Sequence, residues 1–315
     1  MRDIRPLQVL GELLKIHYKK QRHAYCLSSW IESKASSSCD CNHTKPKNSN
    51  NMNTLSKYGT SFVLAASVAF LGTSAQAAYK GTAGQCNNAN KVNATWTYNW
   101  GGSAPSNLAP GVQFYPMWWS YYGASQAQDT AALTALKNAG YNVLLTYNEP
   151  DNTSQANLST ATALQGYTHA SIAARSIGFN NLISPACAND TDTWMSEFMS
   201  AVTSQGLLCH AVAIHAYQST ASSFLSFVDS VHSKYGYNVY VTEFAPTDWA
   251  SPTSITTNDV ITYLNTAIPG LKSRGYVLDY SWYCGTLPGT GALDTAALFD
   301  ASGNLTPAGA VYKTF

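Results

Sequence analysis

Two glutamates each close an apolar run of the sequence. Glu149 ends the run Asn142-Val-Leu-Leu-Thr-Tyr-Asn-Glu, and Glu243 ends the run Asn238-Val-Tyr-Val-Thr-Glu. If these runs are buried parallel strands, both carboxylates lie at the carboxyl ends of strands. A charged group at that place is costly unless it is hydrogen-bonded or has a function, and the active sites of α/β barrels lie at that end of the strands. Two such carboxylates can supply the acid/base and the nucleophile that cleave a sugar–oxygen bond.

The two glutamates have neighbours that suggest different roles. Cleavage with retention places the carboxyl groups about 5–5.5 Å apart, and strand ends three strands apart around one barrel rim could meet this requirement. Glu149 follows Asn148, whose amide suits a sugar hydroxyl, and an apolar setting would raise the pKa of Glu149 towards that of a general acid. Glu243, with tyrosines and His215 within reach, would stay ionised as the nucleophile. The residues alone also allow the reverse assignment.

The elements that must position these glutamates alternate along the chain. Short apolar or aromatic runs predict strands at 94–100, 112–118, 142–147, 181–184, 211–217, 238–242 and 277–283. Apolar residues at helical spacing predict helices at 126–139, 161–177, 192–205, 222–235 and 257–274, several of them ending at a glycine. We expect an α/β fold, a (β/α)8 TIM-type barrel with one N-terminal unit irregular or missing, because only two strands precede Glu149. Residues 297–304 could supplement the barrel, and a doubly wound open sheet is the alternative, although no G-x-G-x-x-G follows a strand.

Residues 1–77 differ from the rest of the chain. Met52 begins a polar stretch, an apolar run at 61–71 and an Ala75-x-Ala77 pattern, which together predict a secretory signal peptide at 52–77. We interpret residues 1–51 as a disordered extension from a start codon assigned too far upstream, with a cytoplasmic extension as the alternative. Residues 78–315 would then be one secreted, extracellular catalytic barrel.

The predicted mature chain is mildly acidic. Residues 78–315 contain eight Lys and Arg against thirteen Asp and Glu, a formal charge of −5. Without basic clusters, this composition argues against nucleic acid as a partner and, after signal cleavage, against a membrane. We expect a monomer that binds a neutral polysaccharide and needs no cofactor.

Four cysteines remain after the predicted cleavage, namely Cys86, Cys187, Cys209 and Cys284. In an exported protein they allow one or two disulfides. Cys187 and Cys209 flank one predicted helix and are the preferred pair. No C-x-x-C spacing supports a metal site, and we expect none.

Several motifs occur in an order that resembles glycoside hydrolase family 128. They are Asn148-Glu149-Pro150-Asp151, Ser184-Pro185-Ala186, His215-Ala216-Tyr217, Thr242-Glu243-Phe244-Ala245, Ser281-Trp282-Tyr283 and Leu298-Phe299-Asp300 followed by Leu305-Thr306. The resemblance covers about 93–312. It implies a retaining barrel glycosidase that cuts β-1,3-glucan internally, with Glu149 as acid/base and Glu243 as nucleophile. The usual His-Trp-Tyr is His-Ala-Tyr here, and the only arginines after residue 77, Arg175 and Arg274, lie in predicted helices rather than near the nucleophile.

Aromatic residues near strand ends are the candidates for binding the sugar. Flat rings pack on the C–H faces of sugars, while hydroxyl, indole and amide groups bond the sugar rim. Since strands also favour aromatics for packing, about half of them should belong to the core. The predicted substrate-binding residues are Asn148, His215, Tyr217, Trp100, Trp118, Trp282 and Tyr283.

The sequence therefore favours a secreted retaining endo-glycosidase acting on β-1,3-glucan. Two alternatives stay open. One keeps the mechanism and changes the polymer to another β-glucan or a β-mannan, because a pair of carboxylates does not determine the linkage. The other is a glycan-binding protein without turnover, which the presence of both carboxylates disfavours.

Overall fold

The computed structural model describes residues 78–188, 193–284 and 291–315, which belong to one compact unit at 75–315. The predicted extension at 1–51 and signal peptide at 52–77 lie outside the described residues. Within the described ranges, no helix has the length and apolar character needed to cross a bilayer.

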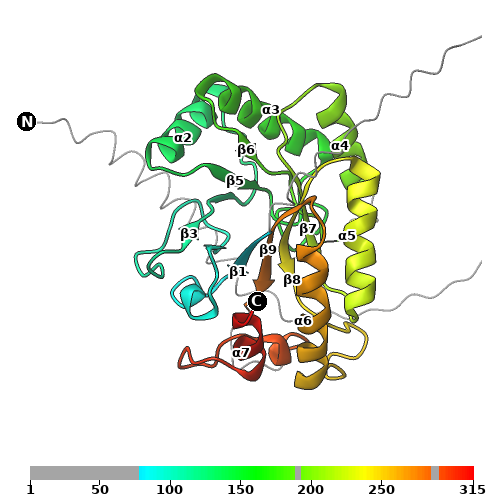
Figure 1. The fold of residues 1–315 in the computed structure, drawn as a ribbon. Helices are drawn as coiled ribbons and strands as arrows, with labels where there is room; N and C mark the ends of the chain where they lie inside the picture. The colour runs from blue at the N-terminus through cyan, green and yellow to red at the C-terminus, as the bar shows by residue number, and fades with distance from the viewer. Residues whose placement is uncertain (1–77, 189–192, 285–290) are drawn as a thin grey trace, which may run out of the picture. The chain divides into compact units, whose positions relative to one another are not determined.

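Parallel strands form the centre of this unit (Figure 1). One sheet has the order β3-β2-β1-β9-β8-β7 and a second has the order β4-β5-β6. Because β3 and β4 are consecutive pieces of one chain segment and a parallel bridge from Ile183 to Ala211 links β6 to β7, the two sheets close into a ring with eight strand positions. The strands are β1 (Tyr79–Ala83), β2 (Trp96–Tyr98), β3 (Gln113–Phe114), β4 (Met117–Trp118), β5 (Val143–Thr146), β6 (Asn181–Leu182), β7 (Val212–Ala216), β8 (Val239–Phe244) and β9 (Val277–Tyr283).

The first strand, β1, is absent from the sequence prediction. Gly81 gives this segment little strand propensity, yet a Cβ there would lie 2.4 Å from the Trp96 ring, so only glycine lets β1 pack against β2. The predicted irregularity lies instead in the third position, where Pro116 has no N–H to donate and separates β3 from β4. Residues 297–304 do not supplement the barrel, because Phe299 and Leu305 form only an isolated antiparallel bridge.

Helices cover the outside of the strands, as Figure 1 shows. The five predicted helices are confirmed with ends that differ by at most two residues, and a sixth near the C-terminus is new. They are α2 (Gln126–Asn138), α3 (Thr160–Ile177), α4 (Thr193–Ser204), α5 (Ala221–Tyr235), α6 (Thr257–Lys272) and α7 (Pro307–Lys313), with short 3-10 turns η1 (Ala89–Val92) and η2 (Asp294–Ala296). Local chemistry fixes their ends: Ser159 caps α3 and Gly178 ends it in the left-handed conformation.

Two sets of buried side chains follow the alternation of the strands. Residues on one face of the strands, among them Trp96, Tyr98, Tyr115 and Tyr240, fill the inside of the ring. Those on the other face pack against the helices. Inside the ring, the Trp96 ring stacks on Tyr115 at 4.5 Å, and the Tyr115 hydroxyl donates to Asp279 at 3.4 Å. A column of aromatic rings therefore joins a buried acid in the barrel to the residues nearer the rim.

The predicted disulfide between Cys187 and Cys209 is wrong. Cys209 is a free thiol whose Sγ donates to the Ala211 carbonyl at 3.4 Å. Burial raises the pKa of Cys209 to about 11, against the lowering effect of the Tyr167 hydroxyl beside it. The Cys209 thiol is therefore reduced and hydrogen-bonded locally, beside Tyr167 of α3.

Candidate active site

Glu149 lies just beyond β5 in a segment whose backbone departs from the strand conformation. Its N–H donates to the Ala186 carbonyl at 2.8 Å, and the Asn152 N–H donates back to the Glu149 carbonyl at 3.0 Å. Tyr147 and Glu149 both have positive φ, 23° and 45°, which is unusual for residues other than glycine. Such conformations cost free energy and concentrate at functional sites. Here they turn the Glu149 side chain towards the centre of the rim.

Glu243 belongs to β8 and pairs with His215 of the neighbouring β7. The register of this pair shifts between Ile214 and His215. A shift of this kind re-aims the side chains that follow it. His215 and Glu243 consequently point to the same side, at the end of the strands where Glu149 also lies.

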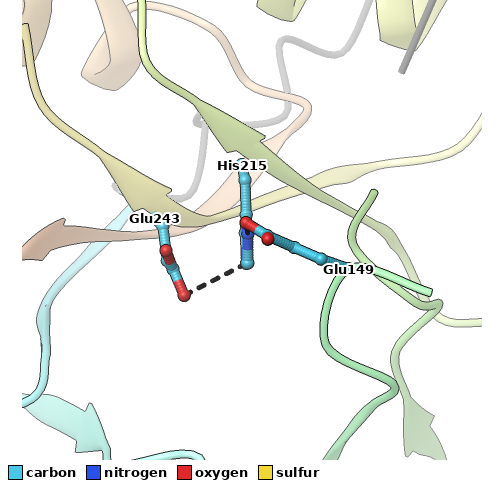
Figure 2. Close-up of side chains that lie close together, drawn as sticks. All are labelled: Glu149, His215 and Glu243. Carbon is cyan, nitrogen blue, oxygen red and sulfur yellow. Dashed lines mark hydrogen bonds and ion pairs between the residues drawn. The ribbon is translucent and has the colours of Figure 1, made fainter. Parts of the chain in front are cut away.

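The two carboxylates and the imidazole form one contact group (Figure 2). His215 Nδ1 is 2.8 Å from Glu149 Oε1, and His215 Nε2 is 3.3 Å from Glu243 Oε1. An oxygen of Glu149 lies within 4.8 Å of an oxygen of Glu243. The histidine side chain is fully buried, whereas the Glu149 side chain keeps 14% of its surface exposed. Of the three side chains, Glu149 is therefore the one that an external molecule can reach most easily.

Glu243 accepts hydrogen bonds from three neutral donors. Tyr98 Oη and Trp100 Nε1 donate to Oε1 at 2.9 and 2.8 Å, and Tyr217 Oη donates to Oε2 at 2.5 Å. Donors of this kind stabilise the ionised carboxylate. Neither arginine of the described residues is among these donors: Arg175 donates to the Gly206 carbonyl, and Arg274 pairs with Asp229.

The charges of the group alter its pKa values. Burial alone would lower the pKa of His215, but the charges of Glu243 and Glu149 and the hydrogen bond to Glu149 raise it above its usual value. Burial alone would raise the pKa of Glu149, but His215 and Asn152 lower it. The prediction that an apolar setting raises the pKa of Glu149 is therefore wrong, because a fully buried imidazole occupies that setting.

Among the described residues, Glu149, His215 and Glu243 are also the group of side chains that could hold a metal ion. Both imidazole nitrogens, however, already face a carboxylate oxygen at hydrogen-bonding or ion-pair distance. A metal ion would have to take the nitrogen lone pair and displace the shared proton. The arrangement is better suited to holding protons than to holding a metal.

The predicted binding residues divide between the site and the core. Asn148, Tyr217, Trp100 and Tyr283 are at the rim: the Asn148 Oδ1 atom is buried without a hydrogen-bond partner, and the Tyr283 ring contacts both Trp100 and Tyr217. Trp118 is half-buried at the end of β4, and its role stays a prediction.

Two of the predicted binding residues are corrected by their burial. Trp282 cannot contact a sugar, because its ring is fully buried against Phe244 and its indole N–H donates to the Ala296 carbonyl at 2.7 Å. His215 is also inaccessible and contacts the two glutamates instead.

Two residues of the site were not among the predicted site residues. Tyr98 donates to Glu243 from β2, and Asn152 Nδ2 donates to Glu149 Oε2 at 3.3 Å. The sequence carries a weak signal for Tyr98, which alternates with Trp96 and Trp100 along one strand. For Asn152 the only signal is its place in the turn after Pro150.

Comparisons with known proteins identify the family of this chain. A family model described as the glycosyl hydrolase catalytic core matches residues 75–312. The chain therefore belongs to this family of glycosyl hydrolases. Alkali-sensitive linkage protein 1 of Schizosaccharomyces pombe (strain 972 / ATCC 24843) is 30% identical over 220 residues, which make up 69% of this chain and 39% of that protein. The chain thus matches less than half the length of this curated relative.

Solved structures show which glycosyl hydrolases this chain resembles in fold. A subgroup I endo-β-1,3-glucanase of family 128 from Amycolatopsis mediterranei, in complex with laminaritriose, is 25% identical with a TM-score of 0.63, covering 75% of this chain and 98% of that one. A subgroup III curdlan-specific exo-β-1,3-glucanase from Blastomyces gilchristii, in complex with glucose, is 25% identical with a TM-score of 0.59 and the same coverage. The resemblance to glycoside hydrolase family 128 is confirmed.

Proposed function

We propose that this protein hydrolyses β-1,3-glucan with retention of configuration, with Glu243 as nucleophile and Glu149 as acid/base. The observation that carries the proposal is the separation of the two carboxylates, whose nearest oxygens lie within 4.8 Å. Retaining enzymes hold the pair about 5–5.5 Å apart, whereas inverting enzymes need about 6.5–9.5 Å to admit a water. The laminari-oligosaccharide bound to a family relative supports a β-1,3-linked substrate.

In the proposed reaction, a Glu243 oxygen attacks the anomeric carbon while the bond from that carbon to the bridging oxygen breaks. Glu149 donates its proton to the departing oxygen. Water then attacks the glycosyl ester, Glu149 removes a proton from it, and Glu243 leaves as a carboxylate. The three donors on Glu243 hydrogen-bond its oxygens before attack and again as it departs.

His215 accounts for the proton that Glu149 must donate. The raised pKa of His215 favours its imidazolium form, in which Nδ1–H donates to Glu149 Oε1 across 2.8 Å. Movement of this proton along the hydrogen bond leaves a neutral imidazole and a protonated Glu149, with no change in the number of protons in the site. The remaining Nε2–H then faces Glu243 at 3.3 Å. A lowered pKa of Glu149 in the resting protein is thus compatible with its role as acid.

The test is turnover of laminarin, measured as new reducing ends, by wild type and by Glu149→Gln and Glu243→Gln variants. Glu197→Gln is the matched control, because this glutamate lies on α4 and its carboxylate accepts from Thr160 at the surface. We expect both site variants to lose activity while folding normally and the control to keep it. Near-normal turnover by either site variant would overturn its assigned role, and glucan binding without turnover by wild type would favour a glycan-binding protein.

Azide rescue separates the two roles. With an activated β-glucoside, Glu243→Gly plus azide should give the α-glycosyl azide, because azide enters from the face that the nucleophile vacated. Glu149→Gly plus azide should give the β-glycosyl azide. An exchange of these two patterns would reverse the assignment, and an α-anomer as the first product of the wild type would refute retention.

The place of action and the linkage are part of the proposal. The Ala75-x-Ala77 pattern after the apolar run supports export, so the protein would act on glucan outside the cell. A panel of laminarin, other β-glucans and β-mannan tests the linkage, and the sizes of the first products distinguish internal from terminal cleavage. Sequencing the N-terminus of the exported protein tests cleavage near Ala78.

A further inference from the structure

We propose that Trp249 is a stacking platform for a glucosyl unit of the substrate that lies beyond the two units joined by the bond to be cleaved. This inference rests on the proposed glucanase function and extends it to a binding residue outside the contact group. Trp249 lies in the chain segment after β8, and 62% of its surface is exposed. A large aromatic ring left open at the rim of a site is more informative than a buried one.

Ring contacts connect Trp249 to the nucleophile. The Trp249 ring lies 5.8 Å from the Tyr217 ring at an interplanar angle of 66°, and the Tyr217 hydroxyl donates to Glu243. Only one tyrosine ring therefore separates Trp249 from the reacting carboxylate. A sugar chain that extends from Glu243 in this direction would reach the exposed indole.

Trp249 is the outer member of an arc of rings. Neighbouring rings along the arc contact each other edge to face at 5.4–6.1 Å, in the order Tyr98, Trp100, Tyr283, Tyr217, Trp249. The polar atoms of Tyr98, Trp100 and Tyr217 are used on Glu243. Trp249 makes no such bond, so its contribution would be its flat apolar face.

The loop that carries Trp249 is tied down at its base. Asp248 Oδ1 accepts from the N–H groups of Ala250 and Ser251 at 3.0 and 3.2 Å, and the Thr247 hydroxyl, which is buried, donates to the Ala292 carbonyl at 3.4 Å. The backbone on both sides of the ring is thus ordered, while the ring itself stays open. A platform of this kind loses little entropy when a ligand binds.

A β-linked glucosyl unit fits this surface. Its ring substituents are equatorial, so both faces present C–H groups that pack on an indole, while its hydroxyls stay hydrated at the rim. Exposure alone does not select Trp249, because Tyr79 is also exposed. Tyr79, however, begins β1 and lies at the opposite end of the parallel strands from Glu243.

The experiment compares Trp249→Ala and Trp249→Phe with wild type on laminarihexaose and on laminaribiose. Loss of a stacked ring should lower kcat/KM for the hexaose roughly 10-fold in the alanine variant and less in the phenylalanine variant. The disaccharide, which cannot fill the outer unit, should change less than about 2-fold. Tyr79→Ala is the control and should change neither. An equal fall for both substrates, or no fall for the hexaose, would overturn the inference.

A binding arm keeps this inference distinct from the proposed reaction. In the Glu149→Gln background, Trp249→Ala should weaken laminarihexaose binding roughly 10-fold, as measured by calorimetry. Unchanged affinity would refute the stacking role of Trp249 even if the wild type hydrolyses laminarin. Weakened affinity with no turnover by the wild type would support the stacking role of Trp249 and refute the proposed hydrolase activity.

Discussion

Replacement of Asp279 by asparagine should change how the stability of the barrel depends on pH. Asp279 is 2% exposed, its Oδ2 accepts from Tyr115, and its Oδ1 has no hydrogen-bond partner. Burial raises its pKa from 3.8 to about 7, against the opposing hydrogen bonds from Tyr240 and Tyr115. The folded protein therefore binds this proton more tightly than the unfolded chain does.

The size of the effect follows from the two pKa values. Between pH 3.8 and about 7 the folded state holds the proton that the unfolded state has released, so the free energy of unfolding falls as the pH rises. Above pH 7 both states have released the proton, and the decrease in the free energy of unfolding is complete. A gap of roughly three pH units corresponds to about 4 kcal/mol. Asparagine has the shape of the neutral acid and does not titrate, so Asp279→Asn should match wild type near pH 4 and exceed it by up to about 4 kcal/mol at pH 8.

Urea unfolding followed by tryptophan fluorescence, at several pH values from 4 to 8, measures this difference. Asp259→Asn is a control of opposite sign, because hydrogen bonds from Thr256 lower the pKa of Asp259 and its contribution is present at high pH. If the free energies of unfolding of wild type and Asp279→Asn differ by the same amount at pH 4 and pH 8, the buried-acid argument is refuted.

Three further variants test the site and the packing below it. Tyr217→Phe removes a hydrogen bond to the charged Glu243, worth about 1.5–3 kcal/mol, and should lower kcat on laminarin roughly 10- to 100-fold. His215→Gln should move the alkaline limb of the kcat/KM profile to lower pH, because the acid proton then rests on a carboxyl group alone rather than on an imidazole of raised pKa. Gly81→Ala should cost about 1–3 kcal/mol in urea unfolding, because the new Cβ would meet the Trp96 ring.

Matched variants control these experiments. Tyr235→Phe removes a hydroxyl that has no hydrogen-bond partner and should leave kcat unchanged. Gly102→Ala places a Cβ no closer than 3.8 Å to a neighbour and should have little effect on stability. A Tyr217→Phe variant as active as Tyr235→Phe would contradict the role of the hydroxyl. An alkaline limb that stays in place in His215→Gln would contradict the shared proton, and a Gly81→Ala variant as stable as Gly102→Ala would contradict the packing argument.

Local pattern in the sequence was enough for most of the elements. Helices α2 to α6 follow from apolar spacing and end signals, and β9 was predicted with its observed bounds, because both depend on near neighbours in the chain. The two glutamates could be selected because they are carboxylates at the ends of apolar runs. The strand that was missed, β1, owes its place to a contact between Gly81 and Trp96 on another strand, which local propensity does not contain.

Only closure of the barrel decided which side chains meet. Trp282 and Tyr283 are adjacent in sequence, yet alternation along β9 sends the first into the helix-packed core and the second to the rim. His215 reaches both glutamates because β7 lies between the other two strands in space and its register shifts just before this residue. The sequence by itself determined the elements and the pair of acids, since these depend on residues close along the chain. The tertiary structure determined the pKa directions, the donors on Glu243 and the faces of the aromatic rings, since each depends on the approach of strands that are distant in sequence.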